Sequence, residues 1–232
     1  MKISPDQSTI FMLIFLLSGL TGCHTSPVKD IDGNKYRTVR IGRQIWMAEN
    51  LKTTRYNDGT DIQSVESYDD WVELSTAAYC WYNNDSVNRE IYGGLYNWYT
   101  VQTDKLCPNG WHVPSDEEWK ELGAILGNDG NAGDALKEKG TRHWKSPNEG
   151  ATNSSRFTAL AGGYRSFDGT FNLLKSDGYW WSSTESVWYR KSPDSPLTIA
   201  FYRNLRYDGH DIYRNASEKS NGFNIRCIKD PE

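Results

Sequence analysis

The fold class is decided by one stretch of the sequence, residues 114–127, which read PSDEEWKELGAILG. Ser115 is a good helix N-cap, and Glu118 follows it by three residues, which is the spacing of a capping box. The apolar residues that follow recur at helical spacing, and they are Trp119, Leu122, Ile125 and Leu126. Gly127 ends this helix, and a second, shorter one is predicted over residues 132–138.

On both sides of this stretch the chain favours short strands. Residues 36–41 alternate in period two, and residues 44–47 predict the returning strand of a hairpin. From residue 154 onward, short aromatic and apolar runs are separated by turns, for which the six Asp-Gly and two Asn-Gly pairs of the chain are suited. We therefore expect an α+β fold with short antiparallel strands, one or two helices and long loops.

The N-terminus predicts export. Residues 10–20 form an apolar run that spans roughly 16 Å as a helix, too short for a bilayer core of about 30 Å but suited to a signal peptide. Leu20-Thr21-Gly22-Cys23 follows and resembles the lipobox of bacterial lipoproteins. We expect a signal peptide over residues 1–22, lipid attachment at Cys23, a tether over 23–29 and one domain over 30–232. The alternative is an ordinary cleaved signal peptide with a chance cysteine.

This reading places the chain in the cell envelope, anchored by lipid to the outer membrane. The formal net charge is −4 and no basic run is present, which argues against nucleic acid as a partner. Ten Trp, fourteen Tyr and seven Phe indicate a folded chain. They also suit carbohydrate binding, in which rings stack on sugar faces, although short strands use such residues in their core as well.

An ordered series of motifs resembles a known family. The motifs are DIDGNKY (30–36), QIWMAENLK (44–52), YCWYNND (79–85), YGGLYNW (92–98), LCPNGWHVPS (106–115), GATNSS (150–155), FTALAGGYR (157–165), YWWSSTE (179–185) and GFNIRCIK (222–229). Together they resemble the Fibrobacter succinogenes major paralogous domain from about residue 28 to 230. The resemblance implies an exported protein, often a lipoprotein, with a divergent C-type lectin-like fold whose long loops carry binding. It implies no settled biochemical activity.

Three cysteines remain after Cys23. In an oxidising compartment the simplest outcome is one disulfide and one spare thiol among Cys80, Cys107 and Cys227. The pairing stays open from the sequence, and Cys107 with Cys227 is the candidate pair.

The chain shows no enzyme signature. None of its histidines has the spacing of a zinc site, and no nucleophile elbow or phosphate-binding loop is present. His112, just before the predicted helix, is expected to make a structural hydrogen bond. We expect no catalytic residue, no metal and no cofactor. Calcium remains an alternative through the lectin-like resemblance, although the Glu-Pro-Asn and Trp-Asn-Asp signatures of calcium-dependent lectins are absent.

The second half of the chain holds aromatic residues beside arginines. The candidate ligand-binding residues are Tyr164, Arg165, Trp180, Trp181 and Trp188. Because neighbouring residues of a strand face opposite sides, one of Trp180 and Trp181 is expected to point outward or into a loop-covered groove. In the alternative, loops from residues 140 to 220 cover both.

The sequence therefore predicts a binding protein that recognises a glycan or another cell-surface ligand. A structural or assembly component of an envelope complex is the second hypothesis, and an uncharacterised enzyme is the third. A cleft lined by Trp180 or Trp181 with Arg165 favours binding, whereas an exposed apolar patch or strand edge favours assembly.

Overall fold

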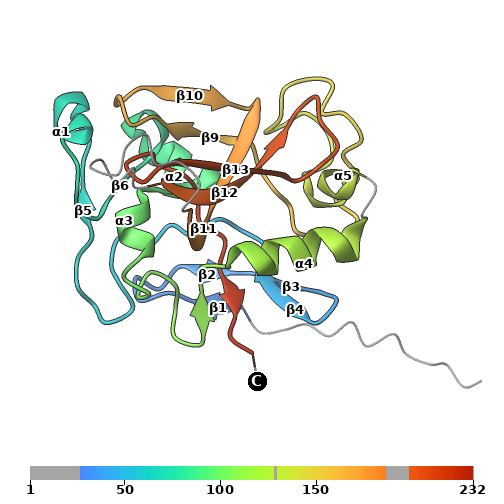
Figure 1. Cartoon of the computed structure of the whole chain (residues 1–232), viewed down its shortest axis with the longest axis horizontal. Helices are drawn as coiled ribbons and strands as arrows, with labels where there is room; N and C mark the ends of the chain where they lie inside the picture. Colours follow the sequence, from blue (N-terminus) through green and yellow to red (C-terminus); the bar gives the residue numbers. More distant parts are fainter. Residues whose placement is uncertain (1–26, 128–129, 187–198, 232) are drawn as a thin grey trace, which may run out of the picture.

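The computed structural model describes residues 27–127, 130–186 and 199–231. These residues form an α+β fold in which short strands dominate, so the predicted class is confirmed (Figure 1). The predicted signal peptide, Cys23 and Trp188 lie outside the described residues. Within the described ranges, no helix has both the length and the apolar character that crossing a bilayer requires.

The helix predicted from residues 114–127 is α4 (Asp116–Leu126). The Ser115 hydroxyl accepts from the Glu118 amide at 3.2 Å, and the Glu118 carboxylate accepts from the Ser115 amide at 2.8 Å, which confirms the capping box. The second predicted helix is α5 (Ala132–Leu136), which ends two residues earlier than expected.

The number of helices exceeds the predicted one or two. The others are α1 (Tyr68–Val72), α2 (Ser86–Tyr92), α3 (Trp98–Val101) and the 3-10 helix η1 (Tyr82–Asn84). The three α-helices have seven residues or fewer, and each begins at a local cap, namely Ser67, Asp85 and Asn97. They are too short to show the apolar periodicity on which helix prediction depends.

Strands from the early and the late part of the described chain share one antiparallel sheet. β3 (Thr38–Ile41) and β4 (Gln44–Met47) form the predicted hairpin, and β14 (Ile228–Lys229) lies between β4 and β8 (Trp111–His112). Two smaller sheets complete this part. They are β1 (Val28–Lys29) with β2 (Lys35–Tyr36), and β5 (Gln63–Ser64), β6 (Ala78–Cys80) and β7 (Leu95–Tyr96).

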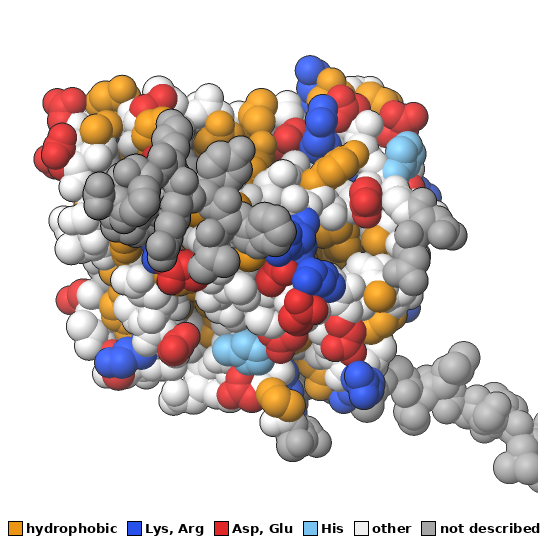
Figure 2. Space-filling view, in the orientation of Figure 1, with side chains coloured by type: hydrophobic (Ala, Val, Ile, Leu, Met, Phe, Trp, Pro, Cys, Tyr) orange, Lys and Arg blue, Asp and Glu red, His pale blue; other side chains and the backbone are white. Residues whose placement is uncertain are grey.

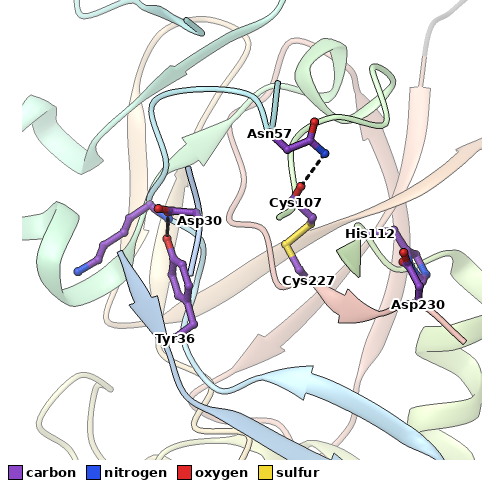
Figure 3. The surroundings of a disulfide bond; sticks show 8 residues. Asp30, Tyr36, Asn57, Cys107, His112, Cys227 and Asp230 are labelled. Carbon is purple, nitrogen blue, oxygen red and sulfur yellow. Dashed lines mark hydrogen bonds and ion pairs between the residues drawn. A yellow bond between two sulfur atoms is a disulfide. The ribbon is translucent and has the colours of Figure 1, made fainter. Parts of the chain in front are cut away.

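A disulfide joins Cys107 to Cys227, the candidate pair (Figure 3). It connects the segment before β8 to the segment before β14, and the Asn57 side-chain amide donates to the Cys107 carbonyl at 3.1 Å. Cys80 is a buried free thiol, and burial raises its pKa to about 12. The disulfide therefore fixes the C-terminal strand, while Cys80 is packed in the interior.

A five-stranded sheet forms the centre of the molecule. Its order is β10 (Phe171–Leu174), β9 (Gly162–Arg165), β11 (Asp177–Ser186), β12 (Ile199–Arg206) and β13 (Tyr213–Glu218). The pairing is antiparallel except between β9 and β11, which meet in parallel at Gly163 and Gly178. In Figure 1, α4 lies between this sheet and the β3–β4 hairpin.

Strand β11 separates two apolar cores. Trp181 packs in one core with Phe223 and Tyr96, and Trp180 packs in the other with Trp119 of α4. The expectation that one of the two indoles points outward is wrong, because β11 is an interior strand with a core on each face. Their exposed fractions are 1% for Trp180 and 0% for Trp181. Each indole N–H has an acceptor at 2.9 Å, the Asn50 side chain and the Tyr96 carbonyl respectively.

Candidate functional site

The predicted binding residues do not form one ligand surface. Trp180 and Trp181 are buried on opposite faces of β11, and Arg165 is only 1% exposed. The Arg165 guanidinium lies over the rings of Trp71 and Phe171. It donates at 2.7–3.1 Å to the carbonyls of Val65, Glu66, Ser67 and Gly169. Arg165 therefore holds the segment before α1 against the β9–β10 hairpin.

Of the described members of that set, Tyr164 is partly exposed. Its ring centroid lies 4.8 Å from that of Tyr179, which lies 5.8 Å from that of Tyr202 on the next strand. Burial raises the pKa of all three phenols. This row packs against Phe223 at the edge of the Trp181 core, so Tyr164 belongs to the boundary of a core.

A hollow of about 340 Å³ lies elsewhere, where β2, α2 and the segment before β14 meet. We call it the charged pocket. It is lined by Lys35, Tyr36, Arg37, Ala48, Glu49, Asn50, Lys52, Arg89, Glu90, Ile91, Gly93, Glu138, His143, Thr158, Leu160 and Arg226. Enclosed hollows with converging polar groups are the usual location of small-molecule sites.

Ion pairs form part of the lining of the charged pocket. Arg37 pairs with Glu49, and both Lys52 and Arg89 pair with Glu90. The hydrogen bond from Lys52 holds the pKa of Glu90 below its usual value, in spite of an opposing effect of burial. Glu90 is therefore ionised at neutral pH, which does not suit a general acid.

The lining also contains a hydrogen-bonded pair and apolar surface. His143 Nδ1 lies 2.9 Å from a Glu138 carboxylate oxygen, and Leu160 and Ile91 add apolar groups. Gly93 closes α2 at a φ of +77°, and a Cβ there would lie 2.7 Å from the Leu51 carbonyl oxygen. Only glycine fits this position, which brings the end of α2 close to the segment that follows β4.

Arg226 lies beneath the pocket with no exposed surface. Its Nε and Nη2 donate to the Asn50 Oδ1 at 3.1 and 2.8 Å, and its Nη1 donates to the carbonyls of Met47 and Phe157. Among the described residues no carboxylate forms an ion pair with it, and burial lowers its pKa to about 9. Asn50 also accepts from Trp180 and donates to the Tyr92 carbonyl, so it links the pocket to β11 and α2.

The charged pocket has the polar lining that a binding site for a polar ligand needs. Its charged side chains offer several hydrogen-bond donors and acceptors to a polar ligand. Sequence reasoning missed it because its residues are spread from position 35 to 226. One signal was present: five of the nine motif segments that carry the family resemblance contribute a lining residue, namely 30–36, 44–52, 92–98, 157–165 and 222–229.

His112 lies outside the charged pocket. Its ring nitrogens contact Asp230 at 2.7 Å and Glu118 at 2.9 Å, and both carboxylates also line a more open hollow of about 480 Å³. The structural hydrogen bond expected of His112 is therefore present twice, and Figure 3 shows the contact with Asp230. No group of three His, Cys, Asp or Glu in the described ranges is arranged to hold a metal ion.

A family model described as the Fibrobacter succinogenes major domain matches residues 39–229. Comparison with curated proteins and with solved structures finds no match. The family match confirms the resemblance inferred from the motifs, and it includes β3 through β14. The chain therefore belongs to the Fibrobacter succinogenes major domain family.

Proposed function

We propose that this chain is an exported protein of the cell envelope, anchored to the outer membrane by lipid on Cys23. We further propose that its domain is C-type lectin-like and binds a glycan in the charged pocket without catalysis. The lipobox-like segment before Cys23 supports the location. The convergence of family motif segments on one polar hollow supports the binding role.

That convergence is the observation on which the binding role depends. A volume of about 340 Å³ lies at the lower end of the range of roughly 300–1,000 Å³ for small-molecule sites, which suits one or two sugar rings. Carboxylates and cations along the sides match the hydroxyl groups of a sugar, and Ile91 and Leu160 offer apolar surface to the face of a ring.

A steric substitution tests this proposal. Ile91 lines the pocket on α2 and is 39% exposed, whereas Val87, one turn earlier on the same helix, is 60% exposed and does not line it. We expect Ile91→Trp to abolish glycan binding by the mature chain and Val87→Trp to leave it intact. A glycan array with and without calcium, followed by titration calorimetry, measures this. The proposal fails if the wild type binds no sugar in either condition, or if Ile91→Trp binds as the wild type does.

The proposed location has its own test. Replacing Cys23 with Ser removes the thiol that carries the lipid, so we expect the full chain to move from the membrane fraction to the soluble fraction. Incorporation of a labelled fatty acid should be lost in the same variant. Labelling that persists in Cys23→Ser excludes this residue as the attachment site.

An assembly role is the second candidate, and exposed apolar side chains favour it. Tyr68 and Val72 on α1 and Phe167 and Leu173 on the β9–β10 hairpin are each more than 40% exposed. A Cβ at Gly169 would lie 2.8 Å from the Tyr68 ring, so the two elements touch. Figure 2 shows apolar side chains along the upper edge, where Figure 1 places α1 and β10. Loss of a cross-linked envelope partner in Tyr68→Ser/Phe167→Ser, with glycan binding unchanged, would support this role.

A further inference from the structure

The charged pocket carries an excess of positive charge in a chain that is acidic overall. Its lining includes five cations, Lys35, Arg37, Lys52, Arg89 and Arg226, and three carboxylates, Glu49, Glu90 and Glu138. The whole chain has a formal net charge of −4. The net charge of the pocket lining is therefore positive, whereas the net charge of the whole chain is negative. The positive lining attracts an anion toward this hollow.

The three carboxylates are already paired. Glu49 pairs with Arg37, Glu90 is shared by Lys52 and Arg89, and Glu138 contacts His143. Lys35 and Arg226 are the lining cations for which the described residues provide no carboxylate partner. Lys35 is exposed and Arg226 is buried, so the two unmatched charges differ in their access to solvent.

The two unmatched cations differ in what they offer to a ligand. The Arg226 donors are committed to Asn50 and to main-chain carbonyls, so Arg226 acts on a ligand through its charge alone. The hydrogen-bond partners of its buried charge are neutral, and the favourable effect of Glu49 on this charge is opposed by that of Arg37, so a nearby anion is favourable. Lys35 is exposed, and its ammonium group is able to donate directly to a ligand carboxylate.

The rest of the pocket suits a sugar ring. Glu49 and Glu138 are acceptors for hydroxyl groups, and Ile91 with Leu160 provides apolar surface. We propose that the ligand of the charged pocket is a sugar that bears a carboxylate, of the hexuronic acid type, with its carboxylate bound by Lys35 above Arg226. This inference rests on the proposed glycan-binding function and specifies the class of glycan.

Calorimetric titration of the mature chain with glucuronate, galacturonate, glucose, galactose and acetate tests the inference. One charge-assisted hydrogen bond and the favourable field should make each hexuronate bind about tenfold or more tightly than its neutral counterpart. We expect the hexuronate affinity to fall as salt rises from low to high concentration, and acetate to bind far more weakly because it lacks the hydroxylated ring.

A pair of lysine variants locates the effect. Lys35→Gln should reduce hexuronate affinity about tenfold and should weaken neutral-sugar affinity much less. Lys175→Gln, an exposed lysine that does not line the pocket, should change neither. Equal affinity for hexuronates and neutral sugars would overturn this inference and leave the proposed function standing. Binding of acetate as tight as that of hexuronates would overturn the sugar class, and absence of all binding would overturn both proposals.

Discussion

Arg165 and Arg226 use the same chemistry in two different parts of the molecule. Both guanidinium groups are buried, both lie 4.3 Å from the centroid of an aromatic ring, and both donate to main-chain carbonyls of irregular segments. Arg165 does not line the charged pocket, whereas Arg226 lies directly beneath it. Their burial is alike, but Arg226 also donates to the Asn50 side chain, so the two arginines differ in location and in one hydrogen-bond partner.

The comparison shows what a buried arginine does in this fold. Long loops leave carbonyls without the partners that a helix or sheet would supply, and a guanidinium satisfies several of them at once. Arg165 was a candidate for ligand binding because it stands beside Tyr164 in an aromatic stretch. The hydrogen bonds of Arg165 indicate a structural role, whereas the effect proposed for Arg226 on a ligand depends on the neighbouring hollow.

The largest expected effect comes from the disulfide next to Arg226. The bond between Cys107 and Cys227 spans a sequence separation of 120 residues, and loop-closure entropy assigns about 4–5 kcal/mol to a loop of this length. We expect Cys107→Ala/Cys227→Ala to lose that much free energy of unfolding, measured by urea denaturation under non-reducing conditions. Hexuronate binding should weaken as well, because Arg226 is adjacent to Cys227.

Cys80→Ala is the control for this measurement. It removes a buried sulfur and leaves the disulfide intact, so we expect a loss of only about 1 kcal/mol. A double variant no less stable than Cys80→Ala would show that the disulfide contributes little to the free energy of unfolding.

The next effect separates the two arginines. Arg165→Met and Arg226→Met each leave buried acceptors without donors, so each should lower the free energy of unfolding by about 3 kcal/mol or more. Their effect on ligand binding should differ. We expect Arg165→Met to retain the hexuronate affinity of the wild type below its melting temperature, and Arg226→Met to lose most of it.

Arg226→Lys keeps the charge and loses the forked hydrogen bonding, so it provides a second variant if Arg226→Met does not fold. Hexuronate affinity measured at 10 °C should then be partly retained. Equal loss of affinity in Arg165→Met and in the Arg226 variants would remove the functional distinction between the two sites.

The sequence predicted the elements whose signals are local. The capping box at Ser115, the turn between residues 41 and 44 and the helix over α4 depend on signals within a few residues, and each was confirmed. Of the apolar residues that predicted α4, Trp119 and Leu122 are buried, whereas Ile125 is 43% exposed. Whether Trp180 and Trp181 are buried depends on which elements cover each face of β11. The structure shows that α4 covers one face and the segment around Phe223 covers the other. No pattern within the strand contains this information.

For the same reason, the charged pocket could not be predicted from local sequence patterns. Lys35 and Arg226 are 191 positions apart and meet only because β14 returns to the sheet that contains β4. The family motif segments were the one indication of the pocket in the sequence, because five of them contribute residues to its lining. The pairing of Cys107 with Cys227 depends on the same return of the chain, which is why composition alone left it open.

A smaller effect is expected from the indole that links β11 to the pocket. The Trp180 N–H and the Arg226 guanidinium donate to the same Asn50 oxygen. Trp180→Phe should cost about 2 kcal/mol of unfolding free energy through lost packing and one hydrogen bond, and Trp181→Phe should cost a similar amount. Only Trp180→Phe should shift hexuronate affinity, because the Trp181 N–H donates to Tyr96 in the other core. A shift in both variants would indicate that the two cores are coupled.

The smallest expected effect is a pH dependence at the far end of β14. His112 is hydrogen-bonded to Glu118, which raises its pKa against the opposing effect of burial, and the contact with Asp230 adds to the increase. A raised pKa in the folded state means that protonated His112 stabilises the fold fully below its unfolded pKa of about 6.5. This contribution is lost as pH rises through the higher folded value.

Glu118 titrates in a different range, which allows the two groups to be separated. Burial alone raises its pKa, but the hydrogen bonds from His112 and Ser115 outweigh burial and lower it. Its contribution is therefore present above its unfolded pKa and is lost only as pH falls through the lowered folded value. A pH range from 5.5 to 9 lies about one unit or more above the usual pKa values of carboxylates. In this range, the wild type and His112→Gln differ in free energy of unfolding mainly through the titration of His112.

We expect that difference to favour the wild type at pH 5.5 and to shrink toward pH 9. Its size should stay below about 1 kcal/mol, because the His112 side chain is 36% exposed and solvent screens its ion pairs. All side chains other than that of residue 112 are the same in both proteins, so their contributions cancel in the difference. Because Asp230 follows β14 and Arg226 precedes it, hexuronate affinity should also decline slightly over the same range if this contact helps to hold the strand. A difference that stays constant with pH would show that His112 acts through packing alone, and that the disulfide holds β14 without electrostatic help from this end.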